Sequence, residues 1–295
     1  MIYSYIRLEN HLRNTVASLK SIAGFIKFEH TLFSLPLIYS GVFLATPQIP
    51  PLSILLLILT ASTGARTAAL ALNRIIDREI DKRNPRTVVR ELPSGRMSLS
   101  TALGILIAGL LLYLASAALI STFCLLLSPI PLIVFVFYPY MKRFTIFAHF
   151  GVGLGLAMAP LGGWFAITQS FEKPFPIALL SLFTLVWVAG FDIIYSTLDE
   201  FFDRESDLFS FSSRFGKEFA LRISGYLHAV SFAILGLLFF VHIRAFAALP
   251  FLLSSGYLLY LEHKKAEDVE FAFFKINAVL GFSVFAMVVV GVYFP

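Results

Sequence analysis

Acidic side chains spaced by about one helical turn stand at the ends of two apolar stretches of this chain. The members of these two acid ladders are Asn73, Asp77 and Asp81 in the first, and Asp192, Tyr195, Asp199 and Asp203 in the second. On a helix, this spacing places the polar groups of each ladder on one face. Carboxylates beside lipid are costly, and their default interpretation is functional. Two facing carboxylate pairs are the arrangement that would hold divalent cations against a diphosphate.

Magnesium is the cation that this donor set favours, because Mg²⁺ prefers oxygen ligands and commonly binds one or two carboxylates together with substrate phosphates. We expect Asp77 and Asp81 to supply one half-site, and Asp199 and Asp203 to supply the other. Asn73 offers an amide oxygen one turn before Asp77. Two ions that bridge a diphosphate would neutralise it and make it a better leaving group.

Basic side chains near the ladders are candidates for binding the diphosphate, since arginine binds phosphate through two hydrogen bonds and lysine binds it as a point charge. The candidates are Arg66, Arg78, Lys142, Arg143 and Arg204. Arg66 lies seven residues before Asn73 on the same helical face, at a depth where a lone arginine needs an anionic partner. The ring of Tyr195 could stabilise a developing carbocation. Structural ion pairs and contacts with lipid headgroups are the alternative roles for these charges.

The composition indicates a helical membrane protein. Of the 295 residues, 58% are hydrophobic and 14% are charged, and the mean hydropathy is +0.83. The apolar runs are near the length of about 20 residues that crosses a bilayer as helix, and helices satisfy their own backbone groups there. We predict one all-α domain over residues 1–295, with its helices in a bundle around a central cavity. The predicted spans are 28–46, 52–73, 98–118, 120–139, 147–168, 176–196, 219–240, 243–261 and 273–293.

Two features leave the topology partly open. Pro129 and Pro131 fall inside the fourth span, so hydropathy alone allows either eight or nine spans. An apolar span also leads into an acid ladder and a basic loop in each half of the chain, which is consistent with a four-helix unit used twice, around residues 28–139 and 147–261. Because the sequence similarity between the two halves is weak, it is compatible with either a true internal repeat or a chance likeness.

Positive charge is concentrated on one side of the nine-span topology. That side carries 20 of the 23 Lys and Arg residues, the exceptions being Arg66, Lys173 and Arg244. Positively charged loops remain in the cytoplasm. We therefore expect an integral protein of the cytoplasmic membrane whose N-terminus is cytoplasmic and whose site opens to the cytoplasm. The same distribution explains the pI of 9.3 without nucleic-acid binding, and the single cysteine excludes a disulfide within the chain.

The ladders and the loops that follow them resemble the UbiA-type family of intramembrane aromatic prenyltransferases. The residues that carry the resemblance are the N-x-x-x-D-x-x-x-D pattern of residues 73–81, NPRTVVRELPSG (84–95), YPYMKRFT (138–145) and the D-x-x-Y-x-x-x-D-x-x-x-D pattern of residues 192–203. The likeness runs from about Lys27 to Gly216 and beyond. Within the family, the chain is similar to the 4-hydroxybenzoate polyprenyltransferase-like subgroup, which is itself similar to enzymes that prenylate a dihydroxynaphthoate in a menaquinone route.

The resemblance implies a magnesium-dependent transferase that moves an isoprenyl chain from a polyprenyl diphosphate to an aromatic acceptor, as a step in making a quinone. It implies that Asp77, Asp81, Asp199 and Asp203 hold magnesium, that Asn73 assists, and that Lys142 and Arg143 engage the diphosphate. Lys27, His30 and Arg66 are candidates for binding an acceptor carboxylate. Arg74 departs from the family, since many members carry an acid there, and this departure leaves donor and acceptor choice open.

Three rival functions share some of these features. A glycerol-phosphate lipid could replace the aromatic acceptor within the same family. A cation-coupled transporter would also bury acids, but near the middle of the membrane rather than at helix ends. A CDP-alcohol phosphotransferase would also bind magnesium through acids, but its D-G-x-x-A-R motif is absent from this chain.

Overall fold

The computed structural model describes residue 22, residues 24–25, and residues 31–269 and 275–294. The regular secondary structure of this part of the chain is entirely helical. The helices in chain order are α2 (Thr31–Leu44), α3 (Leu52–Ile76), α4 (Arg78–Arg83), α5 (Leu99–Ile120), α6 (Thr122–Leu127), α7 (Pro129–Met141), α8 (Ala148–Thr168), α9 (Phe175–Ser196), α10 (Glu200–Glu205), α11 (Phe211–Phe215), α12 (Lys217–Leu238), α13 (Leu249–Lys264) and α14 (Asn277–Tyr293). A π-helical turn, η2 (Phe239–Ile243), and a 3-10 turn, η3 (Phe246–Ala248), join α12 to α13. The all-α prediction is confirmed.

Six helical segments of the described chain are long and apolar enough to cross a membrane. They are Leu52–Ile76, Leu99–Ile120, Thr122–Met141, Ala148–Thr168, Phe175–Ser196 and Lys217–Ile243. The other three predicted spans coincide with α2, α13 and α14, which have 14, 16 and 17 residues. Hydropathy thus located the helices, but the count of nine membrane crossings remains a prediction.

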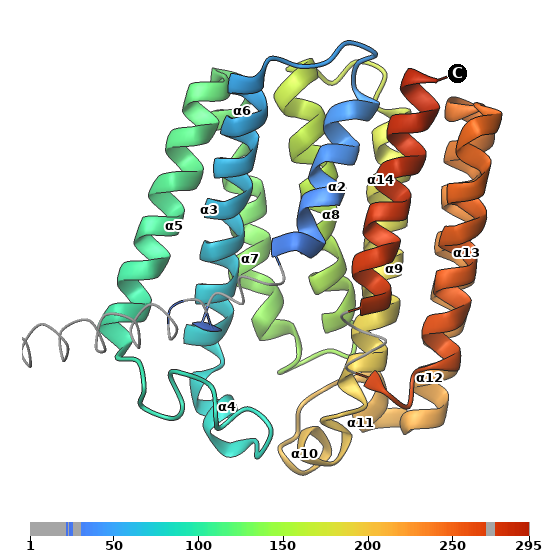
Figure 1. The fold of residues 1–295 in the computed structure, drawn as a ribbon. Helices are drawn as coiled ribbons and strands as arrows, with labels where there is room; N and C mark the ends of the chain where they lie inside the picture. The colour runs from blue at the N-terminus through green and yellow to red at the C-terminus, as the bar shows by residue number, and fades with distance from the viewer. Residues whose placement is uncertain (1–21, 23, 26–30, 270–274, 295) are drawn as a thin grey trace, which may run out of the picture.

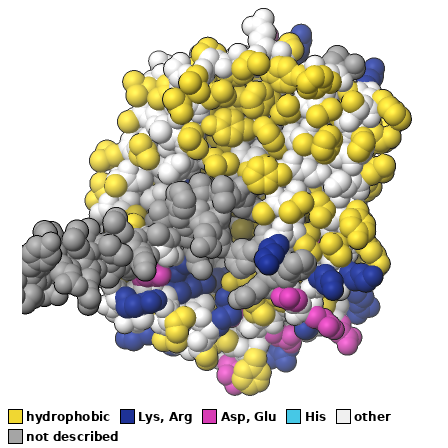
Figure 2. Space-filling model, in the orientation of Figure 1, with side chains coloured by type: hydrophobic (Ala, Val, Ile, Leu, Met, Phe, Trp, Pro, Cys, Tyr) yellow, Lys and Arg dark blue, Asp and Glu magenta, His cyan; other side chains and the backbone are white. Residues whose placement is uncertain are grey.

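The helices stand side by side, and the short helices α4, α10 and α11 lie together at one end of the bundle (Figure 1). Helix α9 is the central helix, because 78% of its most apolar stretch of 18 residues is buried, whereas the figure for α5 at the edge is 17%. On the face drawn in Figure 2, hydrophobic side chains cover most of the bundle, and charged side chains form a band toward the end where the short helices lie. This pattern suits helices that face lipid along most of their length.

Both acid ladders lie where a long helix breaks and a short helix follows. Asp77 has φ −92° and ψ 0° between α3 and α4, and Asp199 has φ −109° and ψ 7° between α9 and α10. The backbone hydrogen bonds nevertheless continue, since the amide of Asp81 donates to Asp77 and that of Asp203 donates to Asp199, both at 2.8 Å. In each ladder, the last two aspartates therefore keep a helical spacing at the start of the short helix.

Glycines bring the backbones of α2 and α8 into direct contact. A methyl group on Gly163 would overlap the carbonyl oxygen of Ile38, and one on Gly41 would overlap that of Pro160. Gly162, the neighbour of Gly163, has no heavy atom within 4 Å of the position where a methyl group would stand. Small residues allow membrane helices to approach closely, so the α2–α8 contact depends on Gly163 and not on Gly162.

We predict that Gly163→Ala destabilises the protein, because the overlapping atom belongs to backbone and the two helices must separate. The expected loss is about 1–3 kcal/mol. The matched control, Gly162→Ala, should leave stability unchanged or raise it by up to about 1 kcal/mol through helix propensity. Thermal unfolding of both variants in detergent measures the difference. Equal stability of the two variants would contradict the close contact.

Candidate active site

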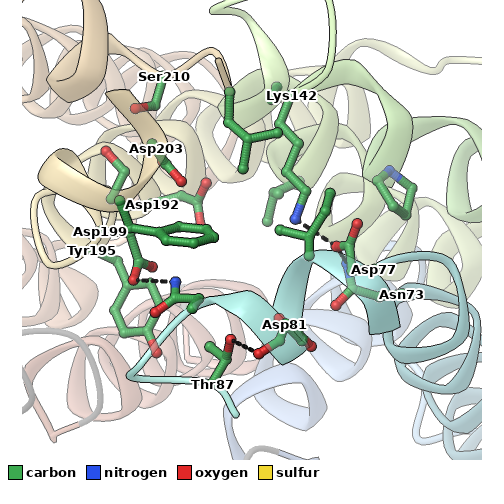
Figure 3. Close-up of a pocket in the computed structure, with 18 of the residues that line it drawn as sticks. Asn73, Asp77, Asp81, Thr87, Lys142, Asp192, Tyr195, Asp199, Asp203 and Ser210 are labelled. Carbon is green, nitrogen blue, oxygen red and sulfur yellow. Dashed lines mark hydrogen bonds and ion pairs between the residues drawn. The ribbon is translucent and has the colours of Figure 1, made fainter. Parts of the chain in front are cut away.

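The two acid ladders line one cavity of about 220 Å³ at the end of the bundle. Asp77 and Asp81 stand on one side of it and Asp199 and Asp203 on the other (Figure 3). All of the residues predicted from the ladders contribute to its wall, namely Asn73, Asp77, Asp81, Asp192, Tyr195, Asp199 and Asp203. Residues more than a hundred positions apart in the sequence are therefore gathered around one space.

The loop after the first ladder makes the contacts that join the two ladders. Asn84 donates a hydrogen bond to Asp199 at 2.8 Å, and Arg86 donates to both carboxylate oxygens of the same residue. Arg86 also donates to the hydroxyl of Tyr195 at 2.7 Å and stacks 4.9 Å from the centre of its ring. A guanidinium bound to both oxygens of a carboxylate has a defined orientation, so this contact fixes the distance between the ladders.

The carboxylates of the first ladder also have cationic partners. Arg90 donates to both oxygens of Asp81 at 2.8 Å, and Lys142 donates to Oδ2 of Asp77 at 2.7 Å. Thr87 holds the same loop in place by donating to the carbonyl of Asp81 at 3.0 Å. The loop between α3 and α5 is thus attached to both sides of the cavity through its own polar side chains.

Burial and neighbouring charges separate the pKa values of the acids. Burial raises the pKa of Asp77. Burial also opposes ionisation of Asp199, but hydrogen bonds from Arg86 and Asn84 hold its pKa below the ordinary value. Burial, together with the charge of Asp199, raises the pKa of Asp203 to about 6. The carboxyl of Asp203 therefore changes its charge near pH 6, much closer to neutral pH than an ordinary aspartate does.

The site requires additional positive charge. Five carboxylates line the cavity, and three cations face them. The carboxylates are those of Asp77, Asp81, Asp192, Asp199 and Asp203, and the cations are Arg86, Arg90 and Lys142. Oδ1 of Asp77 is buried and has no hydrogen-bond partner. A buried carboxylate oxygen without a donor is costly, so these residues fit a bound divalent cation.

The described part of the chain contains no group of three or more His, Cys, Asp or Glu side chains that could hold a metal ion. Magnesium often binds through one or two carboxylates and completes its coordination with water and substrate phosphates. The two separated carboxylate pairs suit that mode of binding, in which the metal and the diphosphate arrive together.

Other predicted residues of the described chain do not line this cavity. Arg78 is partly exposed and pairs with Glu79 at 3.0 Å, and Arg204 is exposed and pairs with Glu200 at 2.7 Å. Arg143 is part-exposed and lies 3.8 Å from Oδ1 of Asp77. Lys27 and His30 lie outside the described residues.

A second cavity, of about 400 Å³, lies among α2, α3, α5, α6, α7 and α8. Its lining is mainly alanine, leucine, isoleucine, phenylalanine and glycine, and it includes Arg66. Tyr138 and Val152 line both cavities. The apolar space thus adjoins the acid cavity, as a molecule with a charged head and an apolar tail would require.

His149 is a site residue that the sequence did not reveal. Its Nδ1 lies 2.7 Å from Oδ2 of Asp192, and its ring is buried beside the acid cavity. A single histidine in an apolar span gives no signal that distinguishes it from a packed core residue. The sequence places Asn84, Arg86 and Arg90 in the basic loop that follows the first ladder. It does not show which residues they contact.

Comparisons with known proteins agree with this architecture. A "4-hydroxybenzoate octaprenyltransferase" of Haemophilus ducreyi is 26% identical over 258 residues, which cover 86% of this chain and 92% of that protein. The apo structure of a UbiA homologue from Aeropyrum pernix K1 superposes with a TM-score of 0.79 at 33% identity, over 89% of this chain and 96% of the other. A UbiA homologue from Archaeoglobus fulgidus, solved with GPP and Mg²⁺, has a TM-score of 0.71 at 21% identity and covers 91% and 99% of the two chains.

The sequence pattern of the UbiA prenyltransferase family matches residues 34–279, which include both ladders, the loop that joins them and most of the helices around the two cavities. This match extends over most of the chain, and the chain therefore belongs to the UbiA prenyltransferase family.

Proposed function

We propose that this protein transfers an isoprenyl chain from a polyprenyl diphosphate to an aromatic hydroxy acid, of the hydroxybenzoate or dihydroxynaphthoate type, in the synthesis of a quinone. The observation that carries the proposal is the pair of adjoining cavities, one lined by acids and cations and the other apolar. The relatives named 4-hydroxybenzoate octaprenyltransferase support the aromatic acid as acceptor. The charged cavity would take the diphosphate, and the apolar cavity the start of the isoprenyl tail.

The ladder aspartates would hold magnesium, two ions in all, with Asp77 and Asp81 on one side, Asp199 and Asp203 on the other, and Asn73 as a further ligand. Bound magnesium would neutralise the diphosphate and favour its departure. Arg86, Arg90 and Lys142 already neutralise the carboxylates, and they are within reach of the same space. They would donate to phosphate oxygens, because cations placed at a leaving group stabilise the charge that develops on it.

The protein would then control the allylic cation that remains. Tyr138 lines both cavities, so its ring is available where the head and the tail of the donor meet, and aromatic faces attract cations. The face of Tyr195 is partly covered by Arg86. After the aromatic ring attacks, a proton must leave, and Asp192, oriented by His149, is a carboxylate at the cavity wall that can accept it.

We further propose that the chain forms one domain in the cytoplasmic membrane, with the acid cavity open to the cytoplasm. The concentration of 20 of 23 Lys and Arg residues on one side supports this orientation. A soluble diphosphate head would reach the site from that side, and the isoprenyl tail would enter from the lipid.

We predict that the purified protein transfers geranyl or longer isoprenyl groups to 4-hydroxybenzoate or a dihydroxynaphthoate only when magnesium is present. Asp77→Asn and Asp199→Asn should each lower turnover by about 100-fold or more, as loss of a group that stabilises transition-state charge does. Glu79→Gln is the matched control, because Glu79 is exposed and outside the cavity. Transfer to glycerol phosphates alone would overturn the aromatic acceptor, and near-normal turnover of both aspartate variants would overturn the metal role.

Arg86 and Arg78 provide a second paired test. Arg86→Ala should raise the KM for the diphosphate by about 10-fold or more, since hydrogen bonds between charged groups contribute about 1.5–3 kcal/mol. Arg78→Ala should change it by less than about 2-fold, because this side chain pairs with Glu79 on the surface. Steady-state kinetics with the diphosphate varied measures both. An equal effect of the two substitutions would contradict the assignment of Arg86.

The pKa of about 6 at Asp203 predicts a pH-dependent demand for magnesium. Below that pH the carboxyl is protonated and cannot bind metal, so the apparent affinity for Mg²⁺ should fall by up to about 10-fold per pH unit. Because metal and proton compete, raising the magnesium concentration should move the acidic limb of the rate profile to lower pH. Initial rates at several pH values and two magnesium concentrations test this, and a limb that does not move would refute it.

A further inference from the structure

Four phenylalanine rings form a continuous row at the end of the bundle where α11 lies (Figure 1). The ring centre of Phe211 is 6.2 Å from that of Phe147 and 6.3 Å from that of Phe215. The ring centre of Phe219 follows at 5.0 Å from that of Phe215. Phe211 is buried, but Phe147 and Phe215 are each 54% exposed. The row thus connects the loop before α8 to α11 and the start of α12, and two of its rings are open to the surroundings.

The row lies where two membrane-crossing segments begin. Phe147 directly precedes the segment Ala148–Thr168, and Phe219 is the third residue of the segment Lys217–Ile243. An exposed phenylalanine ring is unfavourable in water and favourable at the boundary between lipid headgroups and acyl chains. We therefore expect lipid, rather than water, against the exposed edge of the row.

Two basic residues beside the row have no carboxylate partner. Lys217 and Arg222 are exposed residues of α12, and neither forms an ion pair with another described residue. The guanidinium of Arg222 lies 5.9 Å from the ring centre of Phe219. Glu218 is the acid nearest to them in the sequence, but it lies in the first turn of α12, where the positive end of the helix dipole stabilises it. The two cations are therefore free to bind an anion.

One exposed face of α12 continues from these cations along the membrane-crossing segment. The residues of this face are spaced by four, four and seven positions, and they are Arg222, Tyr226, Val230 and Leu237. Tyr226 is 70% exposed, Val230 50% and Leu237 46%. The face thus presents a cation, then a phenol and then aliphatic side chains, which is the order that the phosphate, the glycerol region and the acyl chain of a phospholipid require.

We infer that an anionic phospholipid binds at this place, with its phosphate at Lys217 and Arg222, its acyl chain along the exposed face of α12, and its headgroup region against the phenylalanine row. A lipid fits better than a soluble protein, because the exposed face extends from the cations into a segment that crosses the membrane. The site is separate from both cavities, since neither cation lines them.

A lipid at this site would also steady part of the wall of the acid cavity. Ser210 lines that cavity and is the N-cap residue of α11. The ring of Phe211, the next residue, lies 6.0 Å from that of His149, which lines the same cavity. Because Phe211 is in the middle of the row, a lipid that contacts Phe147 and Phe215 restricts the motion of α11 and of the wall beside it.

The test is the binding of two lipids with identical acyl chains to the purified full-length protein in detergent. Phosphatidylglycerol and phosphatidylcholine are titrated in turn, and native mass spectrometry measures the lipid that stays bound. Wild type should bind phosphatidylglycerol at least about 10-fold more tightly than phosphatidylcholine, and high salt should reduce this preference. Loss of each cation should weaken phosphatidylglycerol binding by about 5-fold, so the double variant Lys217→Gln/Arg222→Gln should lose most of the preference.

The double variant Lys82→Gln/Arg83→Gln is the matched control, because these exposed basic residues belong to α4 and lie outside the row. It should keep the preference of wild type. Phe215→Ser should weaken the binding of both lipids alike, since its ring contributes apolar contact and no charge. Phe201→Ser should change neither by more than about 2-fold, because Phe201 is 73% exposed on α10 and is not part of the row.

Equal affinity of wild type for the two lipids would overturn the inference and leave the row to a protein partner. A full preference in Lys217→Gln/Arg222→Gln, or an equal loss in the α4 control, would also overturn it. If the variant does not fold, the preference of wild type and its salt dependence still decide the matter.

Hydrogen exchange tests the effect on the cavity wall. Phosphatidylglycerol should slow amide exchange in residues 209–216 by about 3-fold or more in wild type but not in Lys217→Gln/Arg222→Gln, because restricted motion lowers the frequency of local opening. Unchanged exchange in wild type would overturn the effect on the wall.

Discussion

The bidentate contact between Arg86 and Asp199 is the interaction on which the site depends. It joins the loop after the first ladder to the second ladder, across 113 positions of sequence. Without it, two runs of aspartates at the ends of different helices would repel each other, and nothing else in the acid cavity binds Asp199 so fully. Asn84 and Tyr195 complete the link by contacting the same pair. A charged group at a lipid boundary is costly, but here each charge lowers the cost of its partner.

The bundle holds this network in place through packing. Helix α9, which carries Asp192 and Tyr195, is buried along most of its length, so the second ladder starts from a rigid element. The glycine contacts between α2 and α8, and between Gly153 of α8 and the backbone of α9, keep three helix axes close. Precise sites are better built on rigid helices than on loops. The apolar cavity lies between α2 and α8 of this group and the helices α3, α5, α6 and α7.

Much of the fold and the core of the site could be predicted from the sequence, because hydropathy and turn-length spacing are local signals. The ladder residues and Lys142 all line the acid cavity, as their pattern suggested. Arg78 and Arg86 are both arginines close to the first ladder in sequence, and only the path of the loop places one on the surface and the other against Asp199. His149 shows the same limit, since its partner Asp192 is 43 residues away on another helix. Hydropathy also does not fix the number of membrane crossings, because α2, α13 and α14 are shorter than the length of about 20 residues that crosses a bilayer. Whether they cross depends on how they pack in the bundle.

The distribution of charge explains why two adjoining cavities are needed. Five carboxylates facing three cations would repel a bare diphosphate, so the acid cavity favours a diphosphate that arrives with its metal. The same surplus of negative charge would repel an aromatic carboxylate, which must nevertheless lie within bonding distance of the allylic carbon. The apolar cavity meets the acid cavity at Tyr138 and Val152, so it offers a position close to the leaving group and away from most of the carboxylates. The junction of the two cavities is therefore the place where the reacting carbons can meet while most of the acceptor stays apart from the carboxylates that surround the diphosphate.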